Sequence, residues 1–153
     1  MSLGLKIVPV TLSLDTNIYA SGDVLADTQE IANCMRSLGG RAIVKSIVVN
    51  DKDDQGQALD IVFLKTNVSL GTENAAVSIS DTNADQMLGF ISIGTDDFID
   101  IGGCRVATRR ALDLIVESAA GSSSLFVGAI SRGTGTYTAS GITLLIGFSA
   151  QDL

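Results

Sequence analysis

Short segments in which apolar and polar residues alternate are the feature that most constrains this fold. In the segment 112–117, Leu112, Leu114 and Val116 fall on one side and Asp113 and Glu117 on the other. Successive side chains of a β-strand point to opposite faces, so this pattern predicts a strand with one buried face. Segments 142–148 and 8–14 repeat it, and their predicted inward residues are Ile142, Leu144, Ile146, Phe148, Val8, Val10, Leu12 and Leu14.

Other runs are apolar on both faces. Segments 43–49 and 59–64 fit central strands of a packed sheet, and 90–93 and 125–130 are shorter candidates. Clusters of Gly, Ser, Thr, Asp and Asn separate these runs, as turns do between antiparallel strands. The sequence therefore predicts a mainly β protein. We expect an antiparallel β-sandwich, jelly-roll-like, with about eight strands in a single domain spanning residues 1–153.

The sequence predicts one short helix. Segment 80–88 fits about two turns, with Ser80 or Asp81 as the cap and with Ala84, Met87 and Leu88 facing inward. Segment 27–35 has some helical spacing, but its surroundings favour a loop that leads into an edge strand.

Pro9 places the first strand at a sheet edge or at a bulge, because proline cannot donate to a strand ladder. Residues 1–10 could then form an extended N-terminal arm that pairs elsewhere.

Composition excludes some function classes. Hydrophobic residues make up 46% of the chain and charged residues only 18%, so apolar surface should remain exposed and bind a protein partner. The net charge of −7 argues against a nucleic-acid ligand, which needs clustered Lys and Arg. No apolar run approaches the ~20 residues of a membrane-spanning helix, and we expect no signal peptide and no membrane partner.

The residues also lack the usual catalytic groups. The chain has no histidine, so it cannot build a Ser–His–Asp or Cys–His unit by itself. Its two cysteines, Cys34 and Cys104, lie far apart in the sequence and are expected to be separate buried thiols rather than a zinc site or a disulfide framework. We expect no enzyme activity and no cofactor.

One acidic turn imitates part of a calcium loop. Asp51, Asp53 and Gly56 match its positions one, three and six, but Val62 stands where a bidentate acid is needed. A solvated turn is the favoured interpretation. Asp51, Asp53 and Asp54 remain weak candidates for a metal site.

Three stretches carry a family resemblance: Tyr19-Ala20-Ser21-Gly22-Asp23, residues 48–53 (VVNDKD) and residues 131–138 (SRGTGTYT). With the order of strands between them, the chain resembles the capsid decoration, or cement, proteins of tailed bacteriophages. The resemblance implies a structural protein of the virion. Such a protein sits on the outer capsid surface after synthesis in the host cytoplasm, and as a homotrimer it bridges subunits of the major capsid protein. It implies no catalytic residues.

Two alternatives stay open: another virion component from the tail or the head–tail junction, and a β-sandwich module that binds carbohydrate or another small ligand. The aromatic content of 5% speaks against a ligand pocket with aromatic walls. For the decoration protein, exposure and the proline point to the N-terminal segment as the partner contact. Its candidate residues are Leu5, Lys6, Ile7, Val8, Pro9 and Val10.

Overall fold

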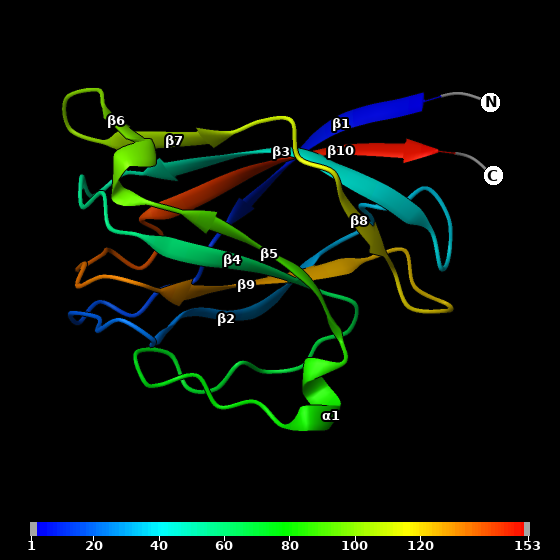
Figure 1. Ribbon diagram of the computed structural model, residues 1–153, viewed down its shortest axis with the longest axis horizontal. Helices are drawn as coiled ribbons and strands as arrows, with labels where there is room; N and C mark the ends of the chain where they lie inside the picture. Colours follow the sequence, from blue (N-terminus) through cyan, green and yellow to red (C-terminus); the bar gives the residue numbers. More distant parts are fainter. Residues whose placement is uncertain (1–2, 152–153) are drawn as a thin grey trace.

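The computed structural model describes residues 3–151, which fold into two facing antiparallel sheets (Figure 1). In the described chain, the six-stranded sheet has the order β1 (Leu3–Thr11), β10 (Ile142–Gln151), β3 (Arg41–Asp51), β7 (Arg105–Arg109) and β6 (Phe98–Asp100), with β8 (Leu114–Glu117) also paired to β3. The four-stranded sheet has the order β2 (Val24–Ile31), β9 (Leu125–Ser131), β4 (Leu59–Leu64) and β5 (Met87–Ile93). The predicted mainly β class is confirmed.

The pairing of the strands is nested. β1 pairs with β10, β2 with β9, β3 with β7 and β8, and β4 with β5, so the chain resembles one long antiparallel hairpin. Successive pairs fall in alternate sheets, because this hairpin is wrapped around the core. That wrapping is the arrangement of a jelly roll, and it agrees with the predicted jelly-roll-like sandwich.

The strands outnumber the eight expected because one jelly-roll position is interrupted. β7 and β8 follow each other along the same side of β3, where the pairing passes from Ile47↔Arg109 to Val44↔Leu114. Residues 110–113 bulge between them, and Ala111 adopts a left-handed φ of 57°. β6 then adds a short edge strand beside β7.

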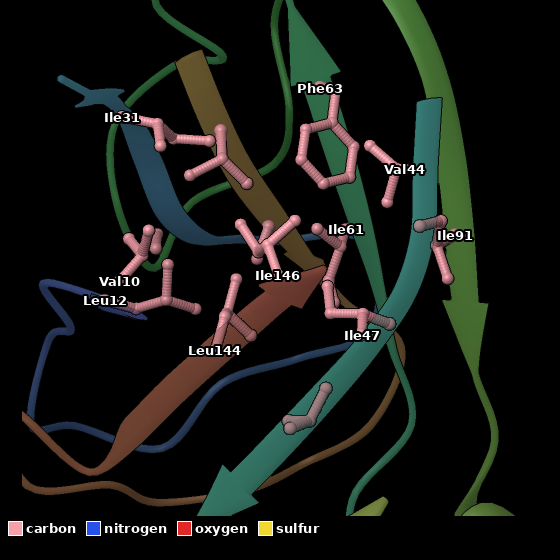
Figure 2. Packing of buried hydrophobic residues seen from close by; sticks show 14 of the residues in the cluster. Val10, Leu12, Ile31, Val44, Ile47, Ile61, Phe63, Ile91, Leu144 and Ile146 are labelled. Atoms are coloured by element: carbon pink, nitrogen blue, oxygen red, sulfur yellow. The ribbon is translucent and has the colours of Figure 1, made fainter. Parts of the chain in front are cut away.

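The core lies between the sheets (Figure 2). The four inward residues predicted for segment 142–148 are all 0–1% exposed, and Val10, Leu12 and Leu14 are likewise buried, with Val8 packed against them. These predictions are confirmed. Figure 2 shows Leu144 and Ile146 from one sheet directed towards Ile61 and Phe63 of the other.

The four-stranded sheet is covered on its outer face as well. Val62 and Leu64 of β4 point away from the main core and join a second cluster with Val24, Ile130 and Leu70. Leu70 belongs to the segment 65–80, which runs along the outside of this sheet in Figure 1. The predicted burial of β4 on both faces is therefore confirmed, and a connecting segment supplies the second cover.

The helix is shorter than predicted. α1 (Asp81–Ala84) has a single turn, which Ser80 caps by accepting the N–H of Asn83 at 3.2 Å. Ala84 is exposed, and Met87 and Leu88 are half-buried in β5, because this segment pairs with β4 instead of continuing the helix. A short 3₁₀ turn, η1 (Thr95–Asp97), follows β5. No helix within residues 3–151 is long and apolar enough to cross a membrane.

One edge prediction is confirmed, and one local prediction is wrong. In the described chain β1 pairs only with β10, so Pro9 lies on an edge strand where a missing N–H costs no ladder bond. The prediction that segment 27–35 is a loop leading into an edge strand is wrong, because residues 27–31 belong to β2 and the strand that follows, β3, has partners on both sides. Of the predicted arm, residues 1–2 lie outside the described residues, and residues 3–10 pair with β10 of the same chain.

Candidate functional site

The outer face of the six-stranded sheet is apolar and open to solvent. Because Leu144, Ile146 and Phe148 of β10 point into the core, the intervening Leu145 and Gly147 point outward. Leu5, Ile7 and Ile115 share this face and are 76%, 68% and 70% exposed. We call it the open face, defined by Leu5, Ile7, Pro9, Ile43, Ile115 and Leu145.

The strand register gathers these residues into rows across the sheet. Leu5 is paired with Ser149, Ser149 with Ile43, and Ile43 with Ile115, so one row crosses four strands. Neighbouring strands lie about 4.8 Å apart, which brings such side chains into contact range. The open face thus carries apolar side chains of β1, β10, β3 and β8 on one side of the sheet, with Ser149 between Leu5 and Ile43. Exposed apolar side chains gathered on one face of a folded chain are typical of a protein-binding surface.

Ion pairs border the open face. Lys45 Nζ lies 2.7 Å from Asp113 Oδ1, and Arg41 Nε lies 3.3 Å from Glu117 Oε2. Glu117 also accepts a hydrogen bond from Lys65 Nζ at 2.8 Å, which, together with Arg41, holds the pKa of Glu117 below its ordinary value. These pairs balance two cations of β3 against two acids of segment 113–117.

A shallow groove of about 470 Å³ lies in the open face beside β1. It forms where β3 carries one extra residue opposite β10, so that the register passes from Gly147↔Ser46 to Phe148↔Val44. Gly147 has no side chain to fill the space, and a Cβ there would collide with the hydroxyl of Ser46. The groove is lined by Leu5, Lys6, Ile7, Lys45, Ser46 and Gly147, among others.

The predicted partner-contact residues divide between the two faces of β1. Leu5, Ile7 and Pro9 are exposed, and Lys6 is exposed while donating to the carbonyl of Asn33 at 3.3 Å. Val8 is half-buried, and Val10 is buried in the core. Contact of these residues with a partner stays a prediction. The sequence reasoning missed Ile115, although its place between Asp113 and Glu117, on the polar side of an alternating strand, was a signal of an exposed apolar residue.

The three stretches behind the family resemblance meet at one end of the sandwich. The N–H of Tyr19 donates to the carbonyl of Gly135 at 3.0 Å, and the rings of Tyr19 and Tyr137 lie 6.0 Å apart. Asp53 accepts hydrogen bonds from Thr138. Burial raises the pKa of Tyr19 to about 12 and also raises that of Tyr137.

The acidic turn of segment 51–56 organises this end of the molecule. Asp51, 1% exposed, accepts the N–H groups of Asp53, Gln55 and Gly56 at 2.7–3.0 Å. Asp54 binds Arg105 Nε at 2.7 Å. The carboxylates of all three candidate metal ligands, Asp51, Asp53 and Asp54, thus already form hydrogen bonds or ion pairs with other groups of the protein. Residues 3–151 contain no cluster of three or more His, Cys, Asp or Glu that could bind a metal ion.

The two cysteines are separate free thiols. Cys34 is fully buried, and its burial raises the pKa of the thiol. Cys104 is half-buried in the turn between β6 and β7, so it is less enclosed than predicted.

Comparison with known proteins gives only distant similarities. No protein-family model and no curated protein matches the chain. Among solved structures, one of Desmodium yellow mottle tymovirus is 10% identical, with 98% of this chain and 82% of that chain covered and a TM-score of 0.32. A subviral particle of infectious bursal disease virus VP2 is 15% identical, with coverage of 96% and 40% and a TM-score of 0.27. Similarities at this level do not bear on the function of the chain.

Proposed function

We propose that this protein is a structural component of a phage virion that decorates the outer capsid surface and stabilises the shell. In this proposal it acts as a homotrimer that bridges neighbouring subunits of the major capsid protein. The observation that carries the proposal is the open face. Segment 65–80 covers the outer face of the four-stranded sheet, whereas the outer face of the six-stranded sheet carries exposed apolar side chains and is not covered by the described part of the chain. Such a surface is expected to be buried against protein.

The construction of the molecule fits this role. A decoration protein must fold before it binds, and here both the core and the loop end are closed by contacts within the chain. Each copy can then bind weakly, because an oligomer that contacts several shell subunits gains avidity from their linkage. Binding to the assembled shell alone would stabilise that state by mass action. A net charge of −7 suits an outer layer that must not adhere to nucleic acid.

The proposal is tested in two measurements with the whole chain. Light scattering gives its mass in solution, and co-sedimentation measures binding to expanded heads of a phage whose capsid gene neighbours this one. We expect discrete trimers that bind expanded heads and ignore unexpanded ones. A chain that ignores expanded heads would overturn the capsid role, and open-ended tubes would indicate a tail component instead.

A matched pair of variants tests the surface. Ile115→Asp places a charge on the open face, whereas Phe90→Asp places one on β5 of the other sheet, where Phe90 is 50% exposed. We expect Ile115→Asp to weaken head binding at least tenfold and Phe90→Asp to leave it within twofold. Equal effects of the two variants would contradict a role of the open face.

A further inference from the structure

We propose that two copies of this chain pair through one part of the open face, related by a two-fold axis that runs parallel to the strands between β3 and its neighbours β8 and β7. The partner of this surface is thus the same surface of a second copy. The role that we give to the contact, joining neighbouring trimers on the shell, rests on the proposed function. The contact itself does not.

The surface is a patch in which ion pairs flank two isoleucines. It consists of Arg41, Ile43 and Lys45 of β3 and of Asp113, Ile115 and Glu117 beside them. These side chains lie on the outer side of the sheet, because Ala42, Val44 and Val116 between them are buried. We call the six residues the ion-pair patch.

The two signs of charge are sorted onto neighbouring strands. Both cations lie on β3, and both acids lie one strand further along the sheet, in segment 113–117. Arg41 is paired with Glu117 in the strand register, and Lys45 Nζ lies 2.7 Å from Asp113 Oδ1, so each cation and its acid stand at the same position along the strands. A column of cations beside a column of acids becomes complementary to itself after a half turn.

This charge complementarity selects a second copy as the partner and fixes the axis. A half turn about an axis parallel to the strands, midway between the two columns, places each residue of β3 opposite the residue with which it pairs in its own sheet. Arg41 then faces Glu117 of the second copy, and Lys45 faces Asp113. A half turn about an axis across the strands would instead set Arg41 against Lys45 and acid against acid. Chains of net charge −7 repel each other, so they meet most favourably where opposite charges face each other.

The apolar residues supply most of the affinity. Ile43 is paired with Ile115 in the sheet, so the same half turn places Ile43 opposite Ile115 of the second copy on both sides of the axis. The pair Val48↔Thr108 continues the facing rows onto β7. Exposed ion pairs contribute little free energy, and therefore the charges set the orientation while burial of the isoleucines drives the contact.

The contact is too small to hold two copies together in dilute solution. With strands about 4.8 Å apart and about 3.4 Å per residue, the facing rows cover roughly 300–500 Å² of each copy. A stable complex buries about 800 Å² per partner. The contact therefore needs a high local concentration, which an occupied shell provides, and there it links the trimers of the proposed function to one another.

Charge reversal tests the contact in the whole chain. The acidic variant carries Arg41→Glu with Lys45→Glu, and the basic variant carries Asp113→Lys with Glu117→Lys. Sedimentation equilibrium measures the mass of each between about 10 µM and about 1 mM. We expect the native mass to rise with concentration and either variant alone to associate at least about tenfold more weakly. A 1:1 mixture should recover association, because four acids then face four cations.

Two further variants keep the test decisive. Lys52→Glu with Arg132→Glu makes the same change in net charge at the end where segments 51–56 and 131–138 meet, and should associate within about twofold of the native chain at 0.15 M salt. The chain with all four patch reversals regains both ion pairs and its self-complementarity, so it should fold and associate like the native chain. It tests the contact even if like charges on neighbouring strands unfold the other two variants, which circular dichroism would reveal.

The outcomes separate this contact from the virion role. A native mass that stays constant up to about 1 mM would overturn the inference. A folded acidic variant that associates like the native chain, a mixture of folded variants that fails to associate, or a fourfold reversal that does not associate would do the same. A chain that pairs in this way but ignores phage heads would remove the capsid role and leave the contact standing. A chain that binds heads without pairing would keep the role and remove the contact.

Discussion

Asp53 accepts two hydrogen bonds from Thr138, one from its backbone N–H at 2.8 Å and one from its hydroxyl at 3.1 Å. The two residues are 85 positions apart, and their contact joins the loop after β3 to the loop before β10. Gln55 and Gln57 extend it by accepting the N–H groups of residues 136 and 134 at 3.0 and 3.2 Å. The side chains of residues 53, 55 and 57 thus accept the backbone N–H groups of residues 138, 136 and 134, as the carbonyl groups of a neighbouring strand would.

We expect Asp53→Ala to lower the free energy of unfolding by about 1–3 kcal/mol, because two donors of Thr138 lose a charged acceptor. Urea denaturation measures the change. The control is Asp85→Ala, at an exposed position beside α1, which should stay within about 0.5 kcal/mol of the native value. If both variants cost the same, the contact between the loops does not stabilise the fold.

Stability should fall in alkaline solution because of Tyr19. Its hydroxyl donates to the carbonyl of Leu25 at 2.9 Å and accepts the N–H of Asp15 at 2.7 Å, and burial raises its pKa to about 12. The folded state therefore resists ionisation more than the unfolded chain, in which the pKa is about 10. The stability linked to this group is complete below pH 10 and is lost as the pH rises from 10 towards 12.

Melting temperature measured against pH checks this prediction. Tyr19→Phe should begin less stable, because the hydrogen bonds of the hydroxyl are lost, but should decline less steeply above pH 10. Some decline should remain, since the pKa of Tyr137 is also raised. Parallel curves for the native chain and Tyr19→Phe would show that Tyr19 does not cause the alkaline loss.

The cover over the four-stranded sheet depends on Gly128 of β9. A Cβ there would lie 2.6 Å from Cδ1 of the buried Leu70, and 3.2 Å from the carbonyl oxygen of Ala26. We expect Gly128→Ala to cost about 1–3 kcal/mol by overpacking, and Leu70→Ala to cost about 2–5 kcal/mol by leaving a cavity. The double variant should cost clearly less than both together, because the shortened side chain makes room for the new methyl group.

Urea denaturation of the three variants gives the coupling between Gly128 and Leu70. Gly103→Ala is the control, since a Cβ at that position meets no atom within 4 Å. If the losses in free energy of unfolding for Gly128→Ala and Leu70→Ala simply add in the double variant, segment 65–80 is not packed on β9.

The two thiols should react at different rates. Cys34 is 0% exposed and its raised pKa lowers the thiolate fraction, whereas Cys104 is half-buried near the surface. A thiol reagent should modify one cysteine of the native chain rapidly and the second only on unfolding. Cys104→Ser should remove the rapid phase, and Cys34→Ser should keep it.

Strand faces could be predicted from the sequence because alternation is a local property. The burial of Ile142, Leu144, Ile146 and Phe148 follows from their spacing whatever strand lies beside them. Helix length could not be predicted in this way. Met87 and Leu88 have helical spacing from Ala84, yet pairing with β4 competes for them, and that partner is about twenty residues away.

Only part of the candidate surface could be predicted from the sequence. The exposure of Leu5 and Ile7 agrees with the predicted N-terminal contact segment, but Ile115 joins them through the register of β10 and β3. The gathering of segments 19–23, 48–53 and 131–138 at one end also depends on how the long hairpin is wrapped. No local pattern in the sequence predicts which of these distant segments come together.

The sequence by itself determined which side of the alternating strands is buried, because the period of two acts within a few residues. The tertiary structure decided which sheet face is covered by the chain's own segment 65–80 and which remains open for a partner. The physical reason is that covering a face needs contacts between segments distant in the chain, and these form only when the nested strand pairs close around a common core.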